Sequence, residues 1–332
     1  MTYSQGGLIQ ATDYNGFAAN TASANVNGVW ATGTTDAGYG QTALTTVSAA
    51  GTVTATQWAG LVNNISSLGS HTGTTITARS APTAGQTIDI LAALNTDLTN
   101  ITTNRGNAVA SGTEYGTFSG TTSQTAGTGS GQSAWTITFT HTVTFASADA
   151  TRYFFNAGGI VRLKYGKSST GTDADPDWNA FAGLCGSINL TGRVNATTNT
   201  IAAQAYTGTT RLSGTGGTQT TLATTTGWYN LTGSPTTIFQ LNDTVSPYST
   251  NFIRTQATAT SSTVLTLVTV WSDDGTSGAG TSANITGGSA TSSPSTTISG
   301  TAPTTLVTYI PPSTTYLTSA SWGTPTIAAS VA

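Results

Sequence analysis

Three aspartates, Asp173, Asp175 and Asp177, alternate along the chain and form its best metal-binding pattern. Alternating carboxylates imitate the first half of a calcium loop, and Asn179 would add another oxygen ligand. The glycine and the closing bidentate glutamate of such a loop are missing, and Pro176 restricts the turn. The alternative is an ordinary acidic loop, and calcium is the one cofactor that the sequence suggests.

Positive charge gathers in the stretch ATRYFFNAGGIVRLKYGK, which holds Arg152, Arg162, Lys164 and Lys167. This pattern predicts a β-hairpin with a three-residue loop at 157–159, where glycines can take the left-handed conformation. In that register Tyr153, Phe155, Val161, Leu163 and Tyr165 share one face, and Arg152, Phe154, Arg162 and Lys164 share the other. Phe154 would then lie opposite Arg162 and stack beneath its guanidinium.

The basic face of this predicted hairpin has two interpretations. Because the acidic loop follows the hairpin, we expect its aspartates to neutralise Arg152, Arg162 and Lys164 as a structural clasp. The alternative is that Arg152, Phe154, Arg162 and Lys164 contact a ligand or a neighbouring subunit.

Side chains that could catalyse a reaction are few and scattered. The single glutamate, Glu114, stands beside a Gly/Ser/Thr-rich stretch, whereas catalysis by paired carboxylates needs a second acid in a different environment. His71 lies in a polar loop and His141 at an inward position of a strand, so a shared metal site would require two regions to converge. Cys185 is typical of a small buried apolar residue. Without a nucleophile elbow, a phosphate-binding loop or zinc-ligand spacing, we predict that the protein is not an enzyme.

The composition excludes several classes of protein. Charged residues make up 6% of the 332 residues, where about 25% is usual. The net charge of −3 is too small to direct the chain to nucleic acid or to an anionic membrane. We expect neither a secretory signal nor a membrane span, because no suitable apolar run occurs. A hydroxyl-rich chain of this kind fits a virion protein that is made in the host cytoplasm and released by lysis.

Two amphipathic helices are predicted in the first hundred or so residues. The first covers residues 54–70, with a capping box at Thr54 and Gln57 and a stop at Gly69. The second covers residues 87–106, with an apolar stripe from Ile88 to Ile101. Their polar faces are rich in mediocre helix formers, so packing must stabilise them. The two helices would pack either against each other or against copies of themselves in an oligomer. We expect the homo-oligomer, and a trimer as its form.

The remainder of the chain reads as β structure. Residues 117–134 form a Gly/Ser/Thr connector between an N-terminal assembly region, 1–116, and a β domain, 135–332. Apolar residues alternate with threonine in WTITFTHTVTF, which predicts a half-buried strand at 135–145. Further strands are predicted at 152–156, 160–165, 186–194, 236–241, 251–259, 263–271 and 304–310. The predicted fold class is mainly β, with a C-terminal β-sandwich or jelly-roll-like domain after two short amphipathic helices.

Several stretches resemble virion structural proteins of tailed phages, especially marine and cyanobacterial ones. YFFNAGG, YSTNFIRTQA and the strand ending TVWSDD carry this resemblance, and GGLIQATDYN and VTATQWAGLVNNI resemble the start of the same proteins. The resemblance covers most of the chain. It implies a virion structural or tail-fibre-like protein, carries over no active site and leaves the position in the particle open.

Three roles follow from this reading. The first is a tail or tail-appendage component that contacts copies of itself and other virion proteins. The second is a capsid decoration or head-fibre protein. The third is a carbohydrate-binding module for host surface polysaccharide, in which Trp178, Trp228 and Tyr229 would stack on sugars, although each could equally belong to the core.

Overall fold

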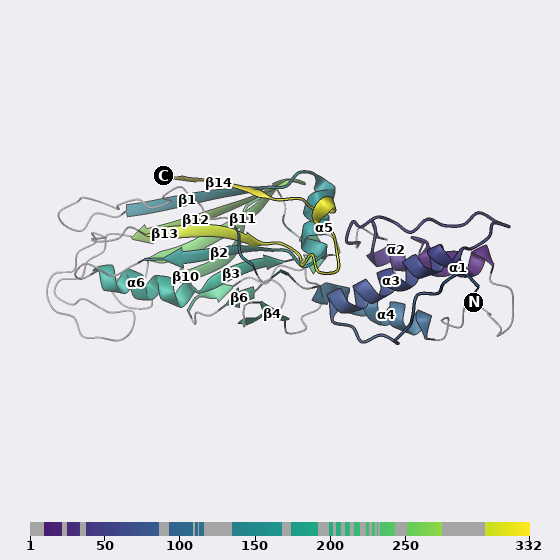
Figure 1. The fold of residues 1–332 in the computed structure, drawn as a ribbon. Coiled ribbons are helices and arrows are strands. Elements are labelled where there is room, and N and C mark those ends of the chain that lie inside the picture. Colours follow the sequence, from purple (N-terminus) through teal and green to yellow (C-terminus); the bar gives the residue numbers. More distant parts are fainter. Residues whose placement is uncertain are drawn as a thin grey trace.

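Helices and strands divide the chain into an N-terminal helical region and a β domain, and a computed structural model shows both (Figure 1). It describes residues 10–21, 25–33, 38–85, 93–108, 110–111, 113–115, 135–167, 174–191, 199–201, 204–206, 210–212, 216–219, 224–225, 228–229, 231, 233–242, 251–273 and 303–332. At 135, 174–177 and 199–229, apart from 216 and 217, the backbone alone is described. The predicted connector at 117–134 lies outside the described residues.

The N-terminal region contains the first predicted helix, a shorter form of the second, and two more helices. The second was predicted at 87–106 but begins at Leu94, after Ala93 with a left-handed φ of 61°, and residues 86–92 lie outside the described part. Its elements are α1 (Ala11–Ala18), α2 (Val26–Val29), α3 (Ala55–Thr72), α4 (Leu94–Asn104) and the 3-10 turn η2 (Arg105–Asn107). Helix α3 begins with the predicted capping box of Thr54 and Gln57. The predicted stop at Gly69 is wrong, because the helix continues to Thr72 and its cap is Gly73, whose φ of 64° is left-handed. In the described part of the chain, no helix has the length and apolar character needed to cross a bilayer.

The apolar stripes of these helices are buried within the chain itself. Trp58 of α3 packs edge-on against Tyr14 of α1, with ring centroids 5.6 Å apart, and Leu98 of α4 is also buried. A buried ion pair of 2.5 Å joins Arg79 to Asp97 beside α4. These apolar stripes therefore need no partner helices from other copies. The trimer remains a prediction, but the helices no longer provide a reason for it.

The larger sheet of the β domain has six antiparallel strands in the order β14-β1-β12-β11-β10-β7. Their bounds are β1 (Trp135–Thr144), β7 (Thr218–Gln219), β10 (Thr236–Asn242), β11 (Phe252–Ser261), β12 (Val264–Asp273) and β14 (Thr326–Val331). On β1 the residues Ile137, Phe139, His141 and Val143 are buried, and the alternating threonines lie on the other face. This alternation is the one predicted for residues 135–145.

The second sheet has four strands in the order β13-β2-β3-β6 and lies against the first (Figure 1). Its strands are β2 (Ile160–Gly166), β3 (Ser187–Thr191), β6 (Thr210–Leu212) and β13 (Thr304–Ile310). Two small hairpins, β4 (Asn199–Ile201) with β5 (Gln204–Tyr206) and β8 (Thr224–Thr225) with β9 (Trp228–Tyr229), complete the described strands. The chain is therefore mainly β, with a sandwich-like arrangement and a small helical N-terminal region, as predicted.

The predicted basic hairpin is wrong, because its first arm is helix α5 (Ala148–Asn156). Ser147 caps this helix by accepting a hydrogen bond from the amide of Ala150, and Asp149 lies in its first turn. The following Gly158 has a φ of 98° and turns the chain into β2. The second arm is the strand expected, with Val161 and Leu163 facing the core.

The predicted acidic loop is also wrong in part, because residues Ala174–Cys185 form helix α6. Proline is tolerated in the first turn of a helix, so Pro176 does not prevent this. The buried residues of α6 recur at helical spacing, and this spacing in the sequence indicates a helix: Trp178, Phe181, Ala182 and Cys185.

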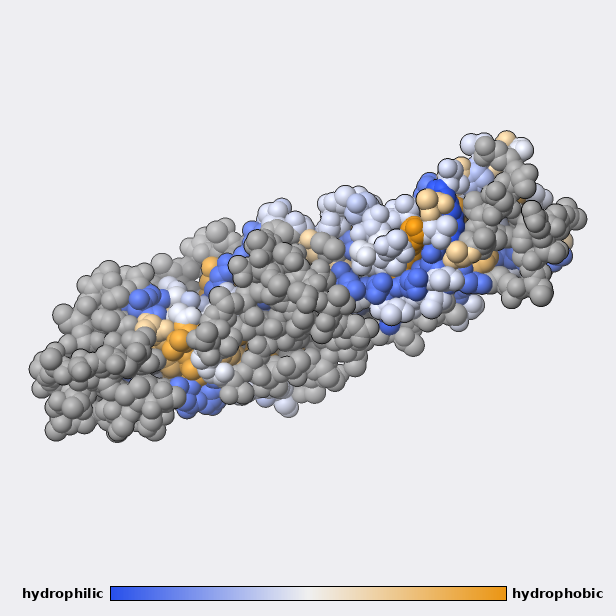
Figure 2. All heavy atoms as spheres, turned by 90° about the horizontal axis from the view of Figure 1, so that it is seen from below, coloured by the Kyte–Doolittle hydropathy of each residue, from blue (hydrophilic) through white to orange (hydrophobic). Residues whose placement is uncertain are grey.

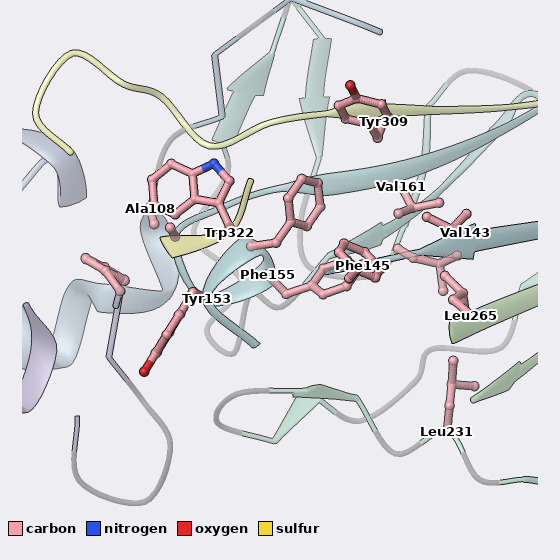
Figure 3. Close-up of a cluster of buried hydrophobic side chains, with 14 of the residues drawn as sticks. Ala108, Val143, Phe145, Tyr153, Phe155, Val161, Leu231, Leu265, Tyr309 and Trp322 are labelled. Carbon is pink, nitrogen blue, oxygen red and sulfur yellow. The ribbon is translucent and has the colours of Figure 1, made fainter. Parts of the chain in front are cut away.

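The N-terminal region docks on the end of the β domain at α5 and at the 3-10 turn η3 (Ser319–Ser321). The Asn156 side chain donates to the Gly38 carbonyl (2.9 Å), and Gln41 accepts from the Thr318 amide (2.8 Å). Figure 3 shows that Ala108 of the N-terminal region and Trp322 lie near the aromatic cluster of α5. One continuous core therefore runs through both parts.

Candidate functional site

The charge cluster that the structure assembles centres on Glu114, which lies along the border of the four-stranded sheet. The segment 110–115 runs antiparallel to the end of β13, with bridges between Ala110 and Pro312 and between Tyr115 and Tyr309. Tyr115 and Tyr309 exchange backbone hydrogen bonds of 2.8 and 2.9 Å. Residues on the N-terminal side of the predicted boundary at 116 therefore pair with the β domain.

Both carboxylate oxygens of Glu114 accept bonds from the sheet. Oε2 accepts from Nη1 of Arg162 at 3.0 Å, and Oε1 accepts from Nζ of Lys164 at 2.7 Å. The hydroxyl of Thr308 also donates to Oε1. Thr308 and Arg162 are cross-strand neighbours on β13 and β2, so a single carboxylate connects the border segment to two strands.

Arg162 extends the contact to a third strand. Its Nε donates to Oδ1 of Asn189 on β3 at 2.8 Å. The Arg162 side chain is 8% exposed, whereas those of Glu114 and Lys164 are 24% and 38% exposed. These five residues, Glu114, Arg162, Lys164, Asn189 and Thr308, are called the Glu114 cluster below.

The surroundings of Glu114 keep it ionised. Burial raises the pKa of its carboxyl, but the hydrogen bonds from Lys164 and Thr308 and the charge of Arg162 outweigh burial, and the net pKa lies below its ordinary value. A carboxylate with a lowered pKa whose oxygens are already engaged is a poor general acid or base. The arrangement is suited to holding segments together.

The remaining residues of the predicted basic face lie elsewhere. Arg152 is on α5, where it pairs with Asp149 at 3.0 Å and lies 4.7 Å from the ring centroid of Tyr153. Phe154 is fully buried against Phe145 and Phe155. The expected stacking of Phe154 under Arg162 is therefore wrong, because the helix turns Phe154 into the core.

The three aspartates predicted to bind calcium do not form the predicted loop in the described part of the chain. Asp173 lies outside the described residues, and Asp175 and Asp177 belong to the first turn of α6, so the loop that would alternate ligands is not formed there. Within the described residues, no three His, Cys, Asp or Glu side chains come together as a metal site would require. The counter-charge expected from these aspartates for Arg162 and Lys164 comes from Glu114, and that for Arg152 comes from Asp149.

Both histidines and the cysteine are inside the protein. His71 on α3 contacts the Ala157 carbonyl through Nε2 at 3.0 Å and so joins the helical region to α5. His141 is fully buried on the inner face of β1. Burial lowers the pKa of His141 to about 4, although a hydrogen bond with the backbone of Thr305 on the facing sheet opposes the shift. Cys185 is buried on α6, as predicted.

Of the three aromatic residues suggested for sugar stacking, the structure describes the side chain of Trp178. Trp178 is buried, with its ring centroid 5.8 Å from that of Trp271, so it belongs to the core. Trp228 and Tyr229 form β9, and their side chains lie outside the described part. The large exposed aromatics of the described residues are Tyr115 and Tyr316, at 49% and 44%. Sequence reasoning did not single out either of them.

Sequence reasoning also missed the role of Glu114. The sequence did contain a signal: Glu114 is the single glutamate among only twelve acidic residues, so it was a candidate partner for the basic residues. Comparison of the chain with protein-family models, with curated proteins and with solved structures finds no match. The functional interpretation therefore rests on the residues, on their geometry and on the resemblance described for the sequence.

Proposed function

We propose that this chain is a non-enzymatic structural protein of a phage virion, and specifically a tail or tail-appendage component. The observation that carries the proposal is that the described groups suited to chemistry are engaged in internal contacts. Glu114 is held by Arg162 and Lys164, and the two histidines and the cysteine are buried. Because the charged side chains of this cluster pair with one another, they support a structural role over a catalytic one.

The surface and the joint between the two parts also support this role. Figure 2 shows that the described surface on one face is mostly neutral or hydrophilic, with small apolar patches. The N-terminal region is fixed to the β domain by Gln41, His71 and Asn156. A rigid, hydroxyl-rich body with few charges is suited to assembly with other virion proteins outside a cell.

The proposal is tested by removing the chain from a particle. A nonsense mutation early in the gene, grown in a host that does not suppress it, is expected to yield particles that lack a tail part in electron micrographs. Particles from a suppressing host are the control. Complete and fully infectious particles without the chain would contradict the proposal, and a defect confined to the head would favour capsid decoration.

A second role, attachment to host polysaccharide, is favoured by the exposure of Tyr115. Its ring stacks on Tyr309 with centroids 5.9 Å apart and planes 23° apart, and nearly half of Tyr115 faces solvent. A fixed aromatic ring of this kind can stack on a sugar. In this version the same structural protein would also contact the host surface.

A further inference from the structure

Strand β14 forms a border of the six-stranded sheet, and in the described part of the chain it pairs with β1 alone (Figure 1). Thr138 of β1 and Ala332 exchange both backbone hydrogen bonds, of 2.7 and 2.9 Å. In an antiparallel ladder, bonded and non-bonded pairs alternate. The Thr138–Ala332 pair therefore determines which residues of β14 are hydrogen-bonded to β1 and which are not.

Alternate residues of β14 consequently direct their backbone groups away from β1. Thr326, Ala328 and Ser330 fall at bonded positions, opposite Thr144, Thr142 and Thr140. Ile327, Ala329 and Val331 fall at non-bonded positions, so their N–H and C=O groups point to the outer side of the sheet. A row of such groups is a template for another strand.

Among the described residues, strand β14 itself carries none of the side-chain features that usually prevent strand addition. Residues 313–332 contain no charged side chain, whereas natural edge strands are commonly protected by lysine, proline or a bulge. Pro325 precedes the strand and is not part of it. Ile327 and Val331 pack against the core but remain half-buried, so a neighbouring strand would cover more of their apolar surface.

We infer that β14 pairs with β14 of a second copy of this chain, antiparallel and about a two-fold axis at Ala329. In this register Ala329 faces its own equivalent, and its outward backbone groups form a bonded pair. Ile327 faces the partner's Val331 at the next bonded position on the same face. The two sheets become one continuous sheet across the axis.

The sequence favours this register over its neighbours. Centred on Ala329, all seven residues from 326 to 332 find a partner, and the apolar Ile–Val pairs meet on the core side. A shift in one direction brings Pro325, which has no N–H, into the ladder. A shift in the other direction reduces the overlap between the two β14 strands, which span Thr326–Val331. Identical strands can meet here because they carry no charge to repel each other.

This inference names a surface for the self-assembly that the proposed function assumes, but its argument uses β14 alone. It replaces the trimer expected from the helices with a two-fold pair. A protein that fails to dimerise would leave the particle experiment above unaffected, so the two proposals fail separately.

The test uses paired charges on the solvent face of β14, where Ala328 and Ser330 are exposed. In the proposed register each Ala328 faces the partner's Ser330. The double variant A328K/S330K places lysine against lysine twice, whereas the control A328K/S330E places lysine against glutamate twice. Because both side chains are exposed in the single chain, neither variant removes a buried contact.

Sedimentation of the full chain over a range of micromolar concentrations is expected to show a dimer for the native protein and for A328K/S330E. The dissociation constant of A328K/S330K should be about tenfold higher or more, from opposed like charges at two sites. A native monomer, a trimer, or a dimer equally stable in both variants would overturn the inference.

Amide hydrogen exchange on the native chain gives a second measurement that does not depend on either variant. The amides of Ile327, Ala329 and Val331 are expected to exchange more slowly as protein concentration rises, whereas those of Ala328 and Ser330, already bonded to β1, should change little. Exchange at the first three amides that is independent of concentration would also overturn the inference.

Discussion

Replacing Glu114 with glutamine is expected to lower the free energy of unfolding by about 3 kcal/mol. The substitution keeps the shape of the side chain but removes the charge that compensates Arg162, whose side chain is 8% exposed. Breaking a buried ion pair by removing one partner costs about 3–5 kcal/mol. The lower end applies because Glu114 itself is 24% exposed. Chemical denaturation followed by tryptophan fluorescence measures the change.

The matched control is Asp149→Asn, which removes the carboxylate partner of Arg152. Asp149 is 65% exposed, so the loss should stay below about 1 kcal/mol, as for surface ion pairs. Equal losses from the two variants would show that the Glu114 cluster is an ordinary surface pair. A near-neutral E114Q would show that segment 110–115 is not fastened to the sheet by its glutamate.

The stability of the protein is expected to fall by about 3 kcal/mol as the pH falls from 6.5 to about 4, because of His141. Its pKa is about 4 in the folded protein, against an ordinary value of 6.5. In this window the unfolded chain takes up a proton that the buried imidazole does not, so acid favours unfolding. Each unit of pKa difference corresponds to about 1.4 kcal/mol.

Denaturation curves of the native protein and of His141→Leu at several pH values isolate this contribution. The variant keeps a side chain of similar size on the inner face of β1 and should lose the pH dependence that His141 adds. Glu114 titrates at lower pH, since its pKa is below its ordinary value, so the two effects separate. The same slope in both proteins between pH 6.5 and 4.5 would contradict the assignment to His141.

The strands of the sandwich were predictable because their pattern has a period of two. In β1 the alternation of apolar residues with threonine identifies the buried face, and the structure buries Ile137, Phe139 and Val143 accordingly. Helix α3 was equally clear, since Thr54 and Gln57 form a capping box that the structure reproduces. In these segments local preference and tertiary packing agree.

The helices α5 and α6 were not predicted because their signals are ambiguous. The run from Thr151 to Phe155 fits a strand as well as a helix, and the following glycines resemble a hairpin turn. The cap at Ser147 and the helical spacing of Trp178, Phe181 and Cys185 were the features that decide between them. Strand β14 was missed because its central residues, Ala328 and Ala329, are of a type depleted in strands.

The sequence identified the basic residues of the site but not the acidic residue that pairs with them. Arg162 and Lys164 do share a sheet face, as the strand period requires, but the residue that neutralises them lies about fifty positions earlier in the chain. Such a contact depends on where segment 110–115 meets β13, which the local sequence does not encode. Counting the few acidic residues would have singled out Glu114 as a candidate.

Labelling the chain in intact virions tests the proposed structural role most directly. An antibody to the β domain, or a tag visible by electron microscopy, would be applied to gradient-purified particles of the phage that encodes the chain. The account predicts label at the tail or its appendages, at a fixed number of copies per particle. Particles without label, with the chain recovered from the lysate alone, would contradict it.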